Sequence, residues 1–152
     1  MTLPTHLMAG LIVGKMTGNY PAAIITSIVF DLVHLFFYYT PDLLFRPFKV
    51  LRKALRAKVY LKGERGVFHS IFTWVLVSVV FMLINFPLGV TVASAYFLHL
   101  ILDALDTSSF YPFYPFKGLN LHGPIIYASF AEVIFLAILS GVYYLIINFV
   151  SL

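Results

Sequence analysis

Histidine and aspartate residues recur at helical spacing inside apolar stretches of this 152-residue chain. The stretch HLILDALD contains His99 and Asp103, four positions apart, and ends at Asp106. Asp31 and His34 are three positions apart in another apolar stretch. Residues three or four apart lie on the same face of a helix. Each pair would therefore present an imidazole and a carboxylate together, at a depth where an acid costs about 2.5–3.5 kcal/mol.

Two further histidines, His6 and His69, lie in separate apolar stretches. Imidazole and carboxylate donors suit zinc, and also manganese or iron, whereas the chain has no cysteine to supply thiolates. The predicted metal ligands are His6, Asp31, His34, His69, His99 and Asp103. This number of donors allows one to three ions. Two neighbouring metal ions are suited to holding a phosphoryl group and activating water.

A simpler interpretation applies to each residue alone, because a buried histidine or aspartate is often only hydrogen-bonded to the backbone. Six such residues on one side of a membrane favour a metal or proton-relay site over packing. We expect Asp106 and Glu132 to transfer protons, although Asp106 could be a helix-end carboxylate and Glu132 a lone ion-pair partner. Arg65 could hold a phosphate or carboxylate by two hydrogen bonds. It could equally be a charge that sets topology.

The composition indicates what positions these residues. Hydrophobic residues make up 61% of the chain and charged residues 11%, with a mean hydropathy of +0.96. These values are typical of an all-α integral membrane protein, here with a single domain over residues 1–152. About five membrane segments are predicted: about 3–17, 21–39, about 66–86, a fourth from the NFPLG turn to about 106, and about 124–149. The first is short and could enter the bilayer without crossing it.

Basic residues predict the orientation in the membrane. Eight of the ten lysines and arginines lie within residues 41–65. The positive-inside rule places that segment in the cytoplasm. The six predicted metal ligands then lie in the cytoplasmic half of the bilayer. We therefore expect an integral protein of the cell (inner or plasma) membrane whose site faces the cytoplasm. We expect residues 41–65 to include a basic amphipathic helix on the membrane surface, favoured by anionic lipid headgroups. Its charges could equally be a topology signal on a solvated face. No nucleic-acid-binding signature accompanies the charge.

The loop SFYPFYPFKG, residues 109–118, alternates aromatic residues with two prolines. Its three-residue rhythm predicts an extended, polyproline-like strip. Aromatic side chains of this kind favour the headgroup level of a membrane. An interfacial anchor is therefore favoured over a substrate lid.

An ordered set of short motifs resembles the YdjM-like family, described as LexA-binding, inner-membrane-associated metal-dependent hydrolases. The matching residues are Thr5-His6 with Gly10, Asp31 with His34, Arg65-Gly66 with His69-Ser70, Tyr96 with His99 and Asp103, and the YPF loop. Two positions depart from the family pattern, because Val33 replaces an acidic residue and Phe68 a threonine. The first departure removes a potential ligand. The set is also distantly similar to zinc-dependent phospholipase C and zinc nucleases, which implies phosphoester hydrolysis.

Three functions follow as hypotheses. The first is a membrane-bound, metal-dependent hydrolase acting on a phosphoester or lipid headgroup, with Arg65 steadying the substrate. The second is a non-enzymatic protein that handles ions or protons, or a metal-binding scaffold subunit, using the same pocket. The third is a pseudo-enzyme that keeps the fold without a full metal set.

Overall fold

The computed structural model of the protein describes residues 1–38 and 66–149, and the side chains of the second helix as far as residue 32. The described residues form five α-helices and one short 3₁₀ helix, without strands. Their bounds are α1 Leu3–Thr17, α2 Tyr20–Tyr38, η2 Val67–His69, α5 Ile71–Ile84, α6 Phe86–Leu105 and α7 Phe130–Phe149. The predicted basic surface helix within 41–65 lies outside the described residues.

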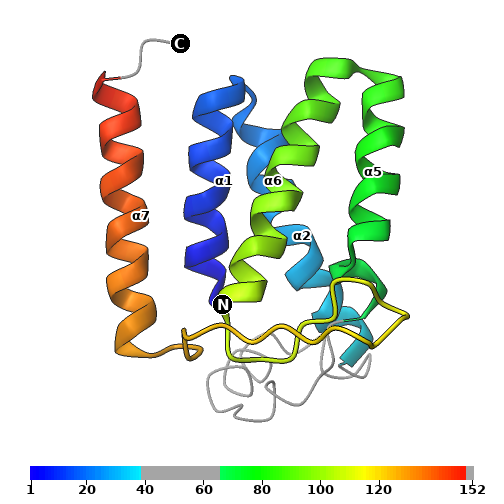
Figure 1. The fold of residues 1–152 in the computed structure, drawn as a ribbon. Coiled ribbons are helices and arrows are strands. Elements are labelled where there is room, and N and C mark those ends of the chain that lie inside the picture. Colours follow the sequence, from blue (N-terminus) through cyan, green and yellow to red (C-terminus); the bar gives the residue numbers. More distant parts are fainter. Residues whose placement is uncertain (39–65, 150–152) are drawn as a thin grey trace.

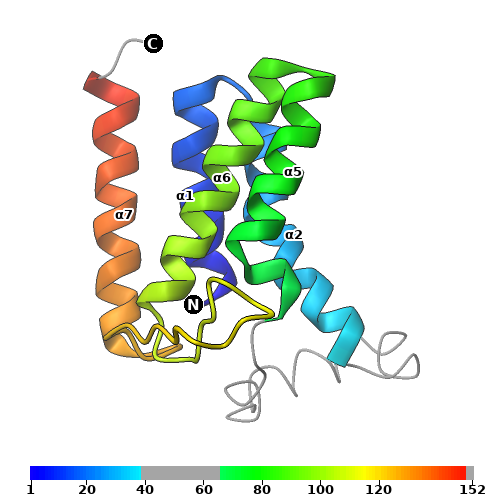
Figure 2. The same ribbon diagram turned by 45° about the vertical axis from the view of Figure 1, so that its right-hand side comes forward.

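Successive α-helices alternate in direction, as Figure 1 shows, and α7 stands at the edge of the bundle beside α1. Figure 2 shows α5 beside α6, with α2 behind them. Consequently α1, α5 and α7 begin at the end where α2 and α6 finish. Side chains from all five helices can therefore meet at that end.

Local sequence signals explain the two tight hairpins. Gly18 ends α1 with a φ of 74°, a left-handed conformation that favours glycine. The side chain of Asn19 then accepts a hydrogen bond from Ala22 N at 3.2 Å. Asn85 ends α5 through its backbone N–H to Phe81 O, and its side chain caps α6 at Leu88 N. The boundary between the first and second predicted segments and that between the third and fourth are therefore tight turns.

Small residues allow α1 to pack closely on α2. A Cβ atom added at Gly10 would lie 2.9 Å from Ser27 Oγ and 3.1 Å from Ile24 Cα. One added at Gly14 would lie 2.9 Å from Tyr20 Cα. The spacing G-x-x-x-G is typical of close helix contacts in membranes. This contact sets the distance between the polar side chains of α1 and those of α2.

Among the described helices, α6 and α7 are long and apolar enough to cross a membrane. At 1.5 Å per residue, each of these 20-residue helices extends about 30 Å, the thickness of the hydrocarbon core. The prediction of about five membrane helices is not supported, because α1 and α5 have only 15 and 14 residues. The all-helical class itself is confirmed.

Two predicted helix starts were too early. The third predicted segment begins at residue 66, but α5 begins at Ile71 because Ser70 caps it, accepting from Thr73 N. The fifth begins at residue 124, but α7 begins at Phe130. Residues before it pair instead with the end of α6, where Ile125 N donates to Leu105 O at 3.0 Å.

The connection from α6 to α7 runs beneath the helix ends (Figure 1). Backbone hydrogen bonds from Tyr114 N to Tyr111 O and from Phe116 N to Phe113 O form consecutive turns. The predicted polyproline-like strip is therefore wrong. Polyproline helices contain no internal hydrogen bonds, whereas this segment has them.

Candidate metal centre

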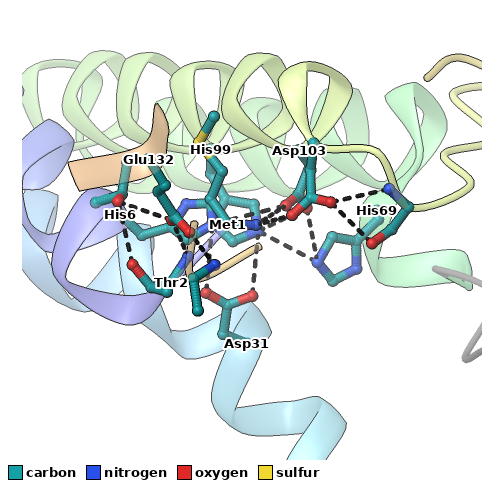
Figure 3. A network of polar contacts seen from close by, with 12 residues as sticks. Met1, Thr2, His6, Asp31, His69, His99, Asp103 and Glu132 are labelled. Atoms are coloured by element: carbon teal, nitrogen blue, oxygen red, sulfur yellow. Dashed lines mark hydrogen bonds and ion pairs between the residues drawn. The ribbon is translucent and has the colours of Figure 1, made fainter. Parts of the chain in front are cut away.

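Five of the six predicted ligands converge at one end of the bundle (Figure 3). They come from four separate elements. These are His6 from α1, Asp31 from α2, His69 from η2, and His99 and Asp103 from α6. His34 lies in α2, but its side chain is outside the described part. Arg65 also lies outside the described residues.

His99 lies at the centre of the cluster. Its Nε2 atom is 3.2 Å from His69 Nε2 and 3.4 Å from Asp103 Oδ2. On the opposite side of the ring, Nδ1 lies 2.9 Å from the carbonyl oxygen of Ser27. A carbonyl only accepts hydrogen bonds, so Nδ1 carries the proton and donates. In the neutral ring this assignment leaves the Nε2 lone pair facing the cluster, as in metal sites where a backbone carbonyl orients the ligating histidine.

Asp103 connects two halves of the cluster. Its Oδ2 atom lies 3.2 Å from His69 Nε2, and its Oδ1 atom lies 3.6 Å from His6 Nε2. His6 Nε2 is also 3.6 Å from Asp31 Oδ2. The imidazole rings of His6 and His99 lie side by side, with centroids 4.2 Å apart. One carboxylate therefore faces histidines on both sides.

The separations between donor atoms fit a divalent ion. Tetrahedral zinc with ligands at 2.0–2.1 Å requires donor atoms about 3.3 Å apart. The closest contacts, at 3.2, 3.4 and 3.6 Å, bracket this value. Two overlapping groups satisfy a wider limit, with all donor atoms within 4.8 Å of one another. These groups are His6, Asp31 and His99, and His69, His99 and Asp103. The donor set and its spacing are thus suited to a zinc-class metal.

The side chains of the cluster differ in exposure, which indicates from which side a molecule could reach it. The side chain of Asp31 is 28% exposed, whereas those of His6 and Asp103 are at most 1% exposed. His69 and His99 are buried to the same degree. Of the described cluster residues, Asp31 is therefore the one that a molecule from outside would meet first.

Tyr96 positions the 3₁₀ helix that contains His69. Its hydroxyl donates to the carbonyl of Phe68 at 2.5 Å, and its ring stacks on Phe30 at 3.9 Å. After His69, Ser70 caps α5 and Ile71 N donates to Pro112 O at 2.8 Å. These contacts hold a short segment with little helical structure of its own. The orientation of His69 therefore depends on α6 and on the loop.

Asp106 faces the amino-terminal residue. Its Oδ2 atom lies 2.6 Å from the amino nitrogen of Met1. Its Oδ1 atom accepts from the backbone N–H and the hydroxyl of Ser108, both at 2.9 Å. Asp106 is also the C-cap residue of α6. The alternative interpretation of Asp106 as a helix-end carboxylate matches these contacts.

Glu132 is enclosed by hydrogen-bond donors from two helix starts. It accepts from Thr2 N, from Thr5 Oγ1 at 3.0 Å and from Ala128 N at 2.6 Å. Because α7 begins at Phe130, Glu132 lies in its first turn and not deep within a helix. An anion there also complements the start of α1, which has no acidic residue in its own first turn. Glu132 thus joins the beginnings of α1 and α7.

Some of these contacts had a sequence signal and others did not. Ser129 Oγ accepts from Glu132 N at 3.3 Å, and the S-x-x-E spacing of a capping box could have predicted this helix start. Ser27 orients His99 through its backbone carbonyl, which any residue would supply. No side-chain pattern could therefore have identified Ser27.

The fold and cluster define an all-helical protein in which two of the described helices could cross a membrane, with a candidate metal centre at one end of the bundle. The chain matches the model of the family described as YdjM inner membrane protein over residues 1–151 and belongs to that family. Neither a curated protein nor a solved structure was found to match it.

Proposed function

We propose that this protein is a membrane-bound, metal-dependent hydrolase acting on a phosphoester, such as a lipid headgroup. The observation that supports this most strongly is the convergence of five buried or half-buried imidazole and carboxylate side chains from four elements. Ionisable groups at membrane depth more often mark functional sites than serve packing alone. The donor set is typical of zinc, with manganese and iron as alternatives.

The proposed site holds one or two ions. His69, His99 and Asp103 Oδ2 would hold the first, because these donor atoms have the shortest separations. His6, Asp31 and Asp103 Oδ1 would hold a second. His99 cannot serve both, because its Nδ1 is used by Ser27 and only Nε2 remains. A third ion would need His34 among its ligands.

A bound divalent ion would supply Lewis-acid stabilisation of a phosphoryl oxygen and activation of water. The residues of the chain perform the remaining tasks. Ser27 and Tyr96 orient His99 and His69. Asp31, on the accessible side, would face the entering substrate. Arg65 would steady the phosphate, as the sequence predicts.

Asp106 and Glu132 are better suited to positioning than to proton transfer. The oxygens of each carboxylate already accept hydrogen bonds from backbone N–H groups and hydroxyls. We assign both residues to holding the start of α1, and therefore His6, against α6 and α7.

We further propose that the site faces the cytoplasm. Residues 41–65 connect α2 to η2, and both meet this segment at the end of the bundle that contains the cluster. Eight of the ten basic residues lie in that connection, which supports a cytoplasmic location. Anionic lipid headgroups would then be the partners of the basic connection. Five crossings require α1 and α5 to span a locally thinned bilayer, at a modest cost.

The alternative function is non-enzymatic handling of ions or protons, or a metal-binding scaffold. The chain of contacts from His6 through Asp103 to His69 could pass a proton. However, Lys15 is the one charged side chain described toward the opposite end of the helices. A path across the membrane would therefore have few charged groups to carry a proton over half its length, which favours the hydrolase.

The test compares purified protein before and after metal removal by a chelator. The substrates are a soluble aryl phosphate ester and phosphatidylglycerol in detergent micelles. We expect hydrolysis of at least one ester, its loss with the chelator and its return with zinc or manganese. His99→Ala should abolish it, and His122→Ala, at an exposed loop histidine, should not. Bound metal without hydrolysis of either ester would favour the scaffold function instead.

A further inference from the structure

The turns between Tyr111 and Phe116 present an exposed apolar surface outside the helices. Phe113 is 42% exposed and Phe116 is 68% exposed. Lys117 follows, with its amino group 5.8 Å from the centre of the Tyr111 ring. A lysine beside exposed aromatic rings is typical of the interface between lipid and water. In water, such rings would form an apolar patch that invites association.

This surface is held rigidly. The backbone of Phe110 pairs with Leu121 through two hydrogen bonds of 3.2 and 2.8 Å. The side chain of Asn120 accepts from Phe110 N at 3.1 Å. Pro112 O accepts from Ile71 N, which fixes the turns to the start of α5. The aromatic rings are therefore presented in a fixed position, and little freedom is lost when they are covered.

The apolar surface of α5 continues into these turns. Phe72, in the first turn of α5, contacts the rings of both Phe113 and Phe116, each with centroids 6.3 Å away. Further along α5, Val75, Leu76 and Val79 are exposed. The two rings thus extend one apolar face beyond the start of the helix.

The length of α5 explains what such an extension would do. Its 14 residues extend about 21 Å, which is short of the roughly 30 Å of hydrocarbon in a bilayer. Apolar side chains below its first turn would lengthen the face in contact with lipid and reduce the mismatch. A soluble partner would not account for continuity with a lipid-facing helix.

We propose that the turns Tyr111–Phe116 are an interfacial anchor, with Phe113 and Phe116 inserted at the boundary between headgroups and acyl chains beside α5. The occupant is the lipid of the leaflet on the side of the His/Asp cluster. The anchor would set the depth of that end of the bundle in the membrane. The exposed side of Asp31 would then lie near the headgroups. This inference depends on α5 facing lipid and not on the hydrolase function.

The test uses tryptophan fluorescence, because Trp74 is the only tryptophan in the chain. In a Trp74→Phe background, Phe113→Trp and Phe116→Trp would be reconstituted separately into phosphatidylcholine–phosphatidylglycerol vesicles with bromine at shallow or deep acyl positions. Leu76→Trp, about 6 Å further along α5 than Phe72, is the matched reference. Size-exclusion chromatography would confirm that each variant remains folded.

We expect shallow bromines to quench Phe113→Trp and Phe116→Trp more than deep bromines do, and Leu76→Trp to show the reverse order. Emission unaffected by either bromine but quenched by aqueous iodide would overturn the proposal by placing the turns in water. Protection from both quenchers would also overturn it, because a second copy of the chain would then cover the surface.

Discussion

Adding one methyl group at Gly10 should weaken metal binding without a change at any ligand. The Cβ atom of Gly10→Ala would lie 3.1 Å from the backbone Cα of Ile24 and 2.9 Å from Ser27 Oγ. Ordinary carbon contacts are about 3.5–4.0 Å, so α1 and α2 must separate by about 0.4–0.9 Å. His6 lies one turn before Gly10 on the same face of α1. The separation of His6 Nε2 from Asp31 Oδ2, now 3.6 Å, would increase by a similar amount.

The size of the effect follows from the cost of overpacking. Inserting a methyl group into a close-packed contact costs about 1–3 kcal/mol. Without metal, α1 and α2 can move apart and relieve the overlap. To share an ion they must approach again, so the overpacking cost reduces the free energy of metal binding. At 1.4 kcal/mol per factor of ten, the affinity for zinc should fall about 5- to 140-fold.

Gly141→Ala is the matched control, because a Cβ atom there has no heavy atom within 4 Å. Both variants replace a helical glycine, so both gain similar helix propensity. Zinc affinity would be measured by competition with a chromophoric chelator in detergent, with helicity followed by circular dichroism. If Gly10→Ala binds zinc as tightly as Gly141→Ala does, the close contact between α1 and α2 does not position His6 as argued.

Three further outcomes are expected. Tyr96→Phe keeps the ring stacked on Phe30 but loses the hydrogen bond to Phe68 O, and its zinc affinity should fall about 10- to 100-fold, as for other orienting residues. A change in cobalt absorption would separate this from general unfolding, and an unchanged spectrum and affinity would contradict it. Glu132→Ala leaves Thr2 N and Ala128 N without their acceptor, and should lower the free energy of unfolding by about 2–4 kcal/mol in thermal or denaturant melts. If stability is unchanged while turnover is lost, the proton-transfer prediction for Glu132 is favoured. Zinc at 100 times its dissociation constant should stabilise the metal-free protein by about 2.7 kcal/mol, and the absence of a melting shift would argue against binding to the folded state.

The convergence of these donor residues could be predicted from the sequence better than the bounds of the elements around them. The i, i+4 spacing of His99 and Asp103 and the alternating direction of the helices were enough to place five donors together. The helix that contains Glu132 was predicted to start near residue 124 but starts at Phe130, because the backbone of Gly123 and Ile125 pairs with the end of α6. Such pairing is a tertiary interaction that helical periodicity does not contain.

Other features could not be derived from local patterns. Pro112 was expected in an extended strip, but its carbonyl accepts from Ile71 N and its segment turns. The choice of Ser27 O as the partner of His99 depends on how closely α2 approaches α6. Hydropathy also suggested about five crossings, whereas the described length and composition support α6 and α7.

The metal content of the purified protein tests the central claim most directly. The protein would be extracted from membranes without a chelator and analysed by mass spectrometry for metal per chain, with Asp103→Ala and His122→Ala in parallel. We predict one or two zinc-class ions per chain in the unaltered protein and in His122→Ala, and a clear loss in Asp103→Ala. Folded, unaltered protein that contains no such ion, and takes up none when zinc or manganese is added, would contradict the account.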